Sequence, residues 1–172
     1  MPRKKTSAPV EADVAVLGVE TSAPVIERVV MFFLEDRKYA FPIDRVQEIQ
    51  QIVELTTVPD VAPALVGMIN LRGSVVPVVD LRLLLGLEEL PYNLQTPMII
   101  CRSGEYLVAI IVDEVEDVVP VPEGSIEPPS SLYALQDRML GVWRMGAELV
   151  FVLDLDRLVP EEALAATGGD VR

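Results

Sequence analysis

The chain has 172 residues, which is the size of one domain or of two small subdomains, and 51% of its residues are apolar. It has 14 basic residues, 27 acidic residues and no histidine, so its formal charge at pH 7 is −13. This composition supports a buried core, and the charge argues against nucleic acid and anionic membrane surfaces as the main partners.

Residues 1–26 show no clear hydrophobic period and are predicted to form a flexible N-terminal tail. The predicted folded domain covers 27–160, and residues 161–172 are predicted to form a C-terminal tail. The apolar runs are far shorter than the ~20 residues that span a bilayer, and the basic start of the chain lacks the apolar segment of a signal peptide. We therefore expect a cytoplasmic protein.

Short runs of β-branched residues, separated by turn-forming residues, fill the predicted domain. Four pairs of runs flank polar or glycine-containing turns and are predicted as hairpins: 29–34 with 39–43, 66–71 with 75–79, 97–102 with 105–112, and 141–145 with 148–153. Further strands are predicted over 45–55 and 115–119. Many short strands predict small barrels or a sandwich, and the two hairpin-rich parts, 29–80 and 97–153, suggest a duplicated barrel.

Helical signals are few. Asp80 is placed to cap a short turn over 81–85 that ends at Gly86, and Asp154 is placed to cap a last turn that ends before Pro160.

The chemistry-bearing residues give little support to an enzyme. Cys101 is the only cysteine and lies in a strand-like stretch, which predicts a buried apolar residue. A catalytic thiolate would need an imidazole, and the chain has none. The acidic run from Asp113 to Asp117 could hold Mg²⁺ or Ca²⁺ or act as acid and base, or it could be a solvated strand end. We assign no catalytic residue, no metal ligand and no cofactor.

The stretch from Gly67 to Arg82 is mostly apolar but places Asn70, Arg72 and Asp80 at defined points. Two interpretations stay open. In the structural one, Asn70 bonds to the backbone and Arg72 pairs with Asp80. In the functional one, Arg72 on a tight hairpin contacts a partner, because the planar guanidinium satisfies several acceptors at once. Upstream, strand alternation would place Val46 and Glu48 together on one side, either as part of an amphipathic strand or on a docking face.

The same stretch reads Gly-x-x-Asn-Leu-Arg-Gly-x-Val-x-Pro-Val-x-Asp-Leu-Arg, which resembles the signature of the CheW family, the adaptors of bacterial chemosensory arrays. Val46-Gln-Glu-Ile49 stands upstream of it, and Ile110-Ile-Val-Asp113 and Ile126-x-Pro128 follow in the order of that family. The resemblance covers 27–160. It implies a mainly β fold of two intertwined five-stranded SH3-like β-barrel subdomains with one or two short helices.

The resemblance also implies a function. Members of the family are non-catalytic and link the cytoplasmic tips of methyl-accepting chemoreceptors to the regulatory domain of a CheA-type histidine kinase, so this chain would be recruited to membrane-associated receptor arrays. The receptor tip would dock in an apolar groove between the barrels, and the kinase would bind the outer end of one barrel. Carried over by motif, the partner-binding residues are Val46, Glu48, Asn70, Leu71, Arg72 and Gly73, the last of which would serve the turn.

Two alternatives stay open at this point. The first is an adaptor of the same fold in a non-flagellar pathway, such as pilus motility or gene regulation. The second, of a different class, is an acidic metal-binding protein or hydrolase that uses the carboxylates between Asp113 and Asp117.

Overall fold

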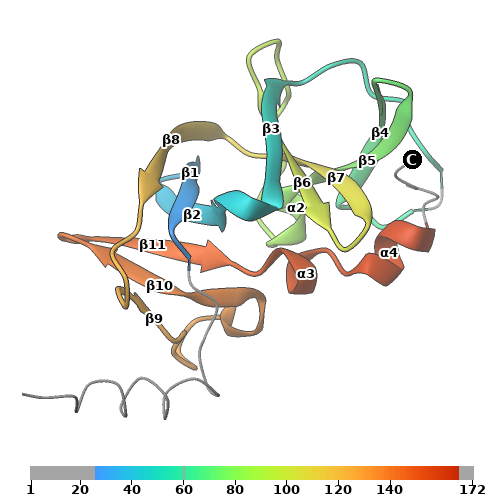
Figure 1. The fold of residues 1–172 in the computed structure, drawn as a ribbon. Coiled ribbons are helices and arrows are strands. Elements are labelled where there is room, and N and C mark those ends of the chain that lie inside the picture. The colour runs from blue at the N-terminus through green and yellow to red at the C-terminus, as the bar shows by residue number, and fades with distance from the viewer. Residues whose placement is uncertain (1–25, 60, 167–172) are drawn as a thin grey trace, which may run out of the picture.

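Two β-sheets make up most of the structure, a computed structural model that describes residues 26–59 and 61–166 (Figure 1). The six-stranded sheet has the order β8-β1-β2-β11-β10-β9. Its strands are β1 (Arg28–Leu34), β2 (Arg37–Pro42), β8 (Glu114–Pro120), β9 (Ile126–Glu127), β10 (Met139–Met145) and β11 (Glu148–Leu153). The five-stranded sheet has the order β3-β6-β7-β5-β4. Its strands are β3 (Val46–Gln51), β4 (Leu65–Leu71), β5 (Ser74–Asp80), β6 (Pro97–Ser103) and β7 (Tyr106–Ile111).

The two sheets are intertwined rather than consecutive in the chain. The chain starts in the six-stranded sheet, leaves it after β2 through a 3-10 turn, η2 (Ile43–Arg45), and returns to it at β8. The expectation of a duplicated barrel over 29–80 and 97–153 is therefore wrong, because β1 and β2 pair with strands that follow residue 113. Hairpin pairing is local and visible in a sequence, whereas the parallel pairing of β2 with β11 is not.

All four predicted hairpins are present, and the expected mainly β architecture with two subdomains is confirmed. One sheet has six strands instead of the expected five. The additional strand, β9, is two residues long and pairs with β10 at Val142 and Trp143. It is too short to produce a recognisable alternation of apolar and polar residues in the sequence.

The five-stranded sheet curls so that its two outer strands approach each other. The chain beyond β3 reaches back to β4, where the backbone of Thr56 exchanges hydrogen bonds of 2.8 and 2.9 Å with Met68. Gly67 makes this approach possible, because a Cβ at this position would lie 2.9 Å from the Thr56 carbonyl oxygen. A second close approach occurs at Gly141, where a Cβ would overlap the carbonyl oxygen of Glu127.

These two glycines give a graded stability prediction. Gly67→Ala and Gly141→Ala are each expected to lower the free energy of unfolding by about 1–3 kcal/mol, because the new methyl group must displace backbone. Gly141→Ala should cost more, since its Cβ meets two atoms more closely than the Gly67 Cβ meets Thr56. Urea unfolding of both variants measures this order, and equal stability of parent and variants would contradict the close approaches.

Three groups of buried apolar residues fill the interior. One lies within the five-stranded subdomain and includes Ile69, Leu71 and Ile100. A second lies within the six-stranded subdomain and includes Trp143 and Val150. The largest group joins the two sheets, because it combines residues of β1, β2 and β11 with residues of β5, β6 and β7. Cys101 belongs to this joint core and is fully buried, as predicted, and burial raises the pKa of its thiol.

One short helix follows β5 of the five-stranded sheet, and another follows β11 of the six-stranded sheet. Asp80 and Asp154 cap α2 (Leu81–Leu84) and α3 (Leu155–Leu158) as predicted, each accepting a hydrogen bond from the backbone N–H two residues ahead. With α4 (Glu161–Ala166), the described residues contain three α-helices instead of the expected one or two, and η3 (Gln136–Arg138) is a 3-10 turn. Helix α4 contacts β7 (Figure 1). Its Leu164 is buried in the joint core.

The predicted tails at 1–26 and 161–172 lie, apart from Ile26 and α4, outside the described residues. Among the residues that the structure describes, no helix has the length and apolar character that a membrane crossing requires.

Candidate partner-binding surfaces

The β4–β5 hairpin presents Arg72 at its tip. Leu71 pairs with Ser74, so Arg72 and Gly73 alone form the turn, with φ values of 51° and 91°. Two consecutive left-handed residues define a type I′ turn, and a residue other than glycine pays a conformational cost at the first position. The Asn70 side chain offsets part of this cost, because its Oδ1 accepts a 2.9 Å hydrogen bond from the Gly73 N–H. The predicted backbone contact of Asn70 is thus confirmed, and the turn holds Arg72 outward.

Arg72 pairs with Glu48 of β3, and not with Asp80 as the structural interpretation expected. The Arg72 Nη1 lies 2.7 Å from the Glu48 Oε2, and the two side chains are 70% and 22% exposed. Asp80 lies at the far end of the seven-residue strand β5, about 20 Å from the turn at the rise of a β-strand. Since β3 and β4 are opposite edges of the sheet order, this ion pair bridges the seam at which the sheet curls closed.

The remaining predicted residues divide between surface and core. Leu71 is buried in the five-stranded subdomain. Val46 is partly buried and packs against the joint core, while Glu48 is partly buried under Arg72. A shift in the β3–β6 register falls between Val46 and Glu48. Ile49 of β3 is not among the predicted contact residues, yet it is 41% exposed. Its only signal in the sequence is that it is the apolar residue in an otherwise polar stretch from Gln47 to Gln51.

A groove of about 610 Å³ separates the two subdomains. One wall consists of β3 from Ile49 to Gln51, the start of β6 and the preceding loop; the other consists of Asp113 to Val115 at the start of β8. Both β3 and β8 are edge strands of their sheets. Seven of the ten lining residues are polar, so the groove is less apolar than the resemblance implied, with Ile49, Pro97 and Val115 as its apolar contacts.

A second, more apolar hollow of about 630 Å³ lies on the five-stranded subdomain. It is lined by residues 52–55 and 92–94, and it adjoins the groove at Asn93, which lines both. Val53 and Leu94 are 45% and 86% exposed there. Exposed apolar side chains gathered at one place are typical of protein–protein contact sites.

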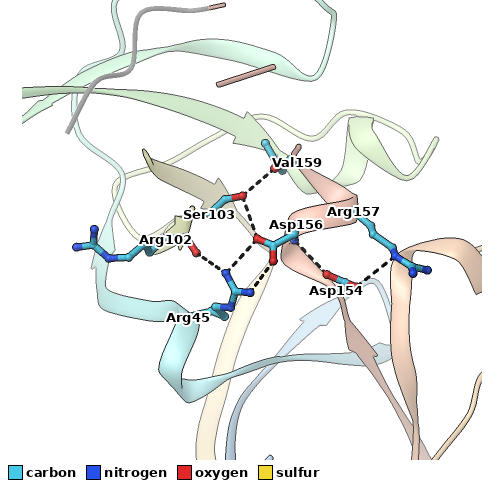
Figure 2. A network of polar contacts seen from close by, with 7 residues as sticks. All are labelled: Arg45, Arg102, Ser103, Asp154, Asp156, Arg157 and Val159. Atoms are coloured by element: carbon cyan, nitrogen blue, oxygen red, sulfur yellow. Dashed lines mark hydrogen bonds and ion pairs between the residues drawn. The ribbon is translucent and has the colours of Figure 1, made fainter. Parts of the chain in front are cut away.

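The position of β3 is fixed by a polar network at its start (Figure 2). The guanidinium of Arg45, the last residue of η2, donates hydrogen bonds of 3.0 and 2.5 Å to the two carboxylate oxygens of Asp156 in α3. The Ser103 hydroxyl, on β6, lies 3.1 Å from the same carboxylate and 3.2 Å from the Val159 carbonyl oxygen. The network therefore ties the entrance of β3 to a helix that follows the other sheet.

The acidic residues between Asp113 and Asp117 contact different partners. Arg82 Nε and Nη2 donate hydrogen bonds of 2.7 and 2.6 Å to the carboxylate of Asp113. Glu116 pairs with Lys38, and Asp117 accepts a hydrogen bond from the Val118 backbone N–H. Between residues 26 and 166, leaving out residue 60, no group of three or more acids, cysteines or histidines gathers as a metal site would require.

A calorimetric titration tests the metal-binding alternative. Because the carboxylates of the run point to different partners, Mg²⁺ or Ca²⁺ at millimolar concentration is expected to give no heat beyond dilution. Saturable heat that disappears in Asp113→Asn would establish a metal site and contradict this reading.

The ionisation of Asp113 gives a pH prediction. Burial opposes its charged form, but hydrogen bonds from Arg82 and from the Glu35 backbone N–H outweigh burial and hold its pKa below the ordinary value. A lowered pKa in the folded state stabilises the protein above the unfolded pKa of about 3.9, and this stabilisation is lost as the pH falls through the folded value. The difference in unfolding free energy between the parent and Asp113→Asn should thus be constant near neutral pH and shrink below about pH 4. Urea titrations across this range measure it, and an undiminished difference at the acid end would contradict it.

The comparisons with known proteins agree with this arrangement. The family model of the CheW-like domain matches residues 28–163. The chemotaxis protein CheW of Klebsiella aerogenes is 30% identical over 156 residues, covering 90% of this chain and 92% of that relative. The CheW of Bacillus subtilis is 40% identical over 101 residues, covering 59% and 65%, and protein FrzA of Myxococcus xanthus is 26% identical over 131 residues, covering 74% and 82%.

Among solved structures, the scaffolding protein TtCheW from Thermoanaerobacter tengcongensis matches with a TM-score of 0.74 and 28% identity, over 80% of this chain and 94% of that one. The family match spans both sheets and the full signature with Asn70, Arg72 and Asp80. The chain belongs to the CheW-like domain family.

Proposed function

We propose that this protein is a non-catalytic adaptor that couples the cytoplasmic tips of chemoreceptors to the regulatory domain of a CheA-type histidine kinase. It would act in the cytoplasm, at membrane-associated receptor arrays. The observation that carries the proposal is the pair of adjoining recesses, the groove between the sheets and the apolar hollow, in a chain of the CheW-like family. The relatives named for chemotaxis and the structural neighbour described as a scaffolding protein support it.

In this proposal each recess has one partner. The groove takes the receptor tip, since its edge strands β3 and β8 offer both polar and apolar contacts. The hollow around Val53 and Leu94 takes the kinase domain, since it offers exposed apolar side chains. Arg72, held outward by its turn, contributes a charged contact that orients a partner.

Coupling then follows from tethering. A kinase bound to the hollow is held beside a receptor bound to the groove, which raises the effective concentration of each partner for the other without a chemical step. Individual affinities need only be modest, because an array provides many such links.

Separate titrations test the two assignments. The fluorescently labelled chain is titrated with a receptor signalling-tip fragment and, independently, with the kinase regulatory domain. We expect both partners to bind saturably. Ile49→Asp should weaken only the binding of the receptor fragment, and Val53→Asp should weaken only the binding of the kinase domain. Absence of binding to either partner would contradict the proposed function.

The alternative within the same fold is an adaptor of a non-flagellar pathway. The match to protein FrzA, which does not carry a chemotaxis name, supports this alternative. The kinases and receptors encoded beside the gene distinguish the two, because the cognate kinase should bind more tightly than a kinase of the other pathway.

A further inference from the structure

A buried polar network lies where the chain crosses from the five-stranded sheet to the six-stranded sheet. At its centre is Arg82 of α2, whose side chain is 8% exposed. Its guanidinium makes the two hydrogen bonds to Asp113 and a third, of 3.1 Å, to the carbonyl oxygen of Glu88. Two parallel hydrogen bonds between charged groups fix distance and orientation together.

Asp113 is bound to both subdomains at once. It lies between β7 and β8, so it is the crossover itself. Its backbone N–H donates to the Phe33 carbonyl oxygen (3.1 Å), and its Oδ2 accepts from the Glu35 N–H (2.7 Å), both at the β1–β2 hairpin of the six-stranded sheet. Through its carboxylate it is also held by Arg82, which follows β5 of the other sheet. Asp113 therefore sets where β8 begins relative to the five-stranded subdomain.

The same network holds the opposite wall of the groove. Asp80 is 1% exposed; its Oδ1 accepts from the Arg82 backbone N–H (2.9 Å) and its Oδ2 from the Tyr92 hydroxyl (2.6 Å). Tyr92 lies in the loop between α2 and β6, whose residues Asn93 and Thr96 line the groove. A cavity of about 180 Å³ beneath the loop is lined by members of this network and adjoins the groove at Asn93, Thr96 and Asp113.

We propose that Arg82 is a positioning residue: by binding Asp113 on one wall of the groove and the Glu88 carbonyl oxygen in the loop that leads to the other wall, its side chain sets the width of the groove between β3 and β8 and thereby its fit to a receptor tip. The part that concerns the receptor rests on the proposed function. Weakening the contact between Arg82 and Asp113 allows a wider range of groove widths. The two subdomains stay joined, because the joint apolar core and the Arg45–Asp156 contact still connect them.

Distance measurement by electron paramagnetic resonance tests the geometry without any partner. Spin labels are attached through Gln51→Cys and Glu114→Cys, which are exposed residues on opposite walls. The native Cys101 is fully buried and does not compete for label. We expect one narrow distance distribution in the parent and at least a doubling of its width in Asp113→Asn, whereas the control Arg144→Gln, at an exposed position on β10, leaves the width unchanged.

Arg82→Lys serves as the second variant. Lysine keeps the charge but lacks the fork that binds both carboxylate oxygens, so an intermediate width is expected. Circular dichroism confirms that each variant is folded before it is measured. A distribution as narrow in both folded variants as in the parent overturns the inference.

Binding separates a positioning role from a purely structural one. Asp113→Asn is expected to weaken the binding of the receptor fragment on the order of tenfold and to change the affinity for the kinase domain less than threefold. Equal weakening of both partners would indicate general destabilisation and overturn the proposed role of Arg82. If the parent itself binds no receptor fragment while the distances still broaden, the proposed function fails and the control of groove width stands.

Discussion

Arg82→Ala is expected to lower the free energy of unfolding by about 3–5 kcal/mol, because it leaves the Asp113 carboxylate partly buried without its bidentate partner. This is a large share of the roughly 5–15 kcal/mol that holds a typical domain folded. Asp113 loses both guanidinium hydrogen bonds, and the Glu88 carbonyl oxygen loses its donor. Urea unfolding at neutral pH, followed by far-ultraviolet circular dichroism, measures the change.

The matched control is Arg144→Ala, which removes the same side chain from an exposed position of β10. Its effect is expected to stay within about 0.5 kcal/mol, as for most surface substitutions. An Arg82→Ala variant as stable as Arg144→Ala would show that the buried network does not contribute to the joint between the subdomains.

Arg72→Glu is expected to weaken partner binding on the order of 100-fold while changing the unfolding free energy by no more than about 1 kcal/mol. The side chain is 70% exposed, so little folding energy depends on it, yet its turn holds it outward at a conformational cost. The variant also places a second carboxylate beside Glu48 at the docking surface. Titration with both partners, together with thermal unfolding, measures the two effects separately.

Arg144→Glu controls for net charge, since both substitutions change the chain from −13 to −15. It is expected to alter neither affinity by more than a small factor. The exchanged pair Glu48→Arg with Arg72→Glu sharpens the test further, because it restores the internal ion pair but not the outward arginine. Recovery of stability without recovery of binding is predicted; parental binding by Arg72→Glu alone would remove Arg72 from the docking surface.

Local features of this fold could be predicted from the sequence, and long-range ones could not. The four hairpins, the Asp80 and Asp154 caps and the contact of Asn70 with its turn depend on residues a few positions apart, so turn chemistry reveals them. The chain crosses between the sheets at Arg45 and Asp113, and this crossing depends on pairings between distant segments, β1 with β8 and β2 with β11. No pattern within one segment encodes them, and the apparent repeat of hairpins suggested a duplication instead.

The candidate site shows the same division. The motif around Arg72 identified the exposed turn, but its partner was expected to be Asp80 within the same hairpin and is Glu48 on another strand. The hydrogen bonds between Arg82 and Asp113 join residues 31 positions apart, and no local pattern in the sequence predicts them. Ile49 is not among the contact residues predicted from the sequence, because exposure on an edge strand depends on where the sheet ends.

The most direct test of the coupling function is sedimentation velocity. The chain is mixed with both a receptor signalling-tip fragment and the kinase regulatory domain. The groove and the hollow are distinct recesses that meet only at Asn93, so a complex that contains all three components is predicted, heavier than either pairwise complex. If the receptor fragment instead displaces the kinase domain, so that only pairwise complexes form at any ratio, the protein does not couple the two partners.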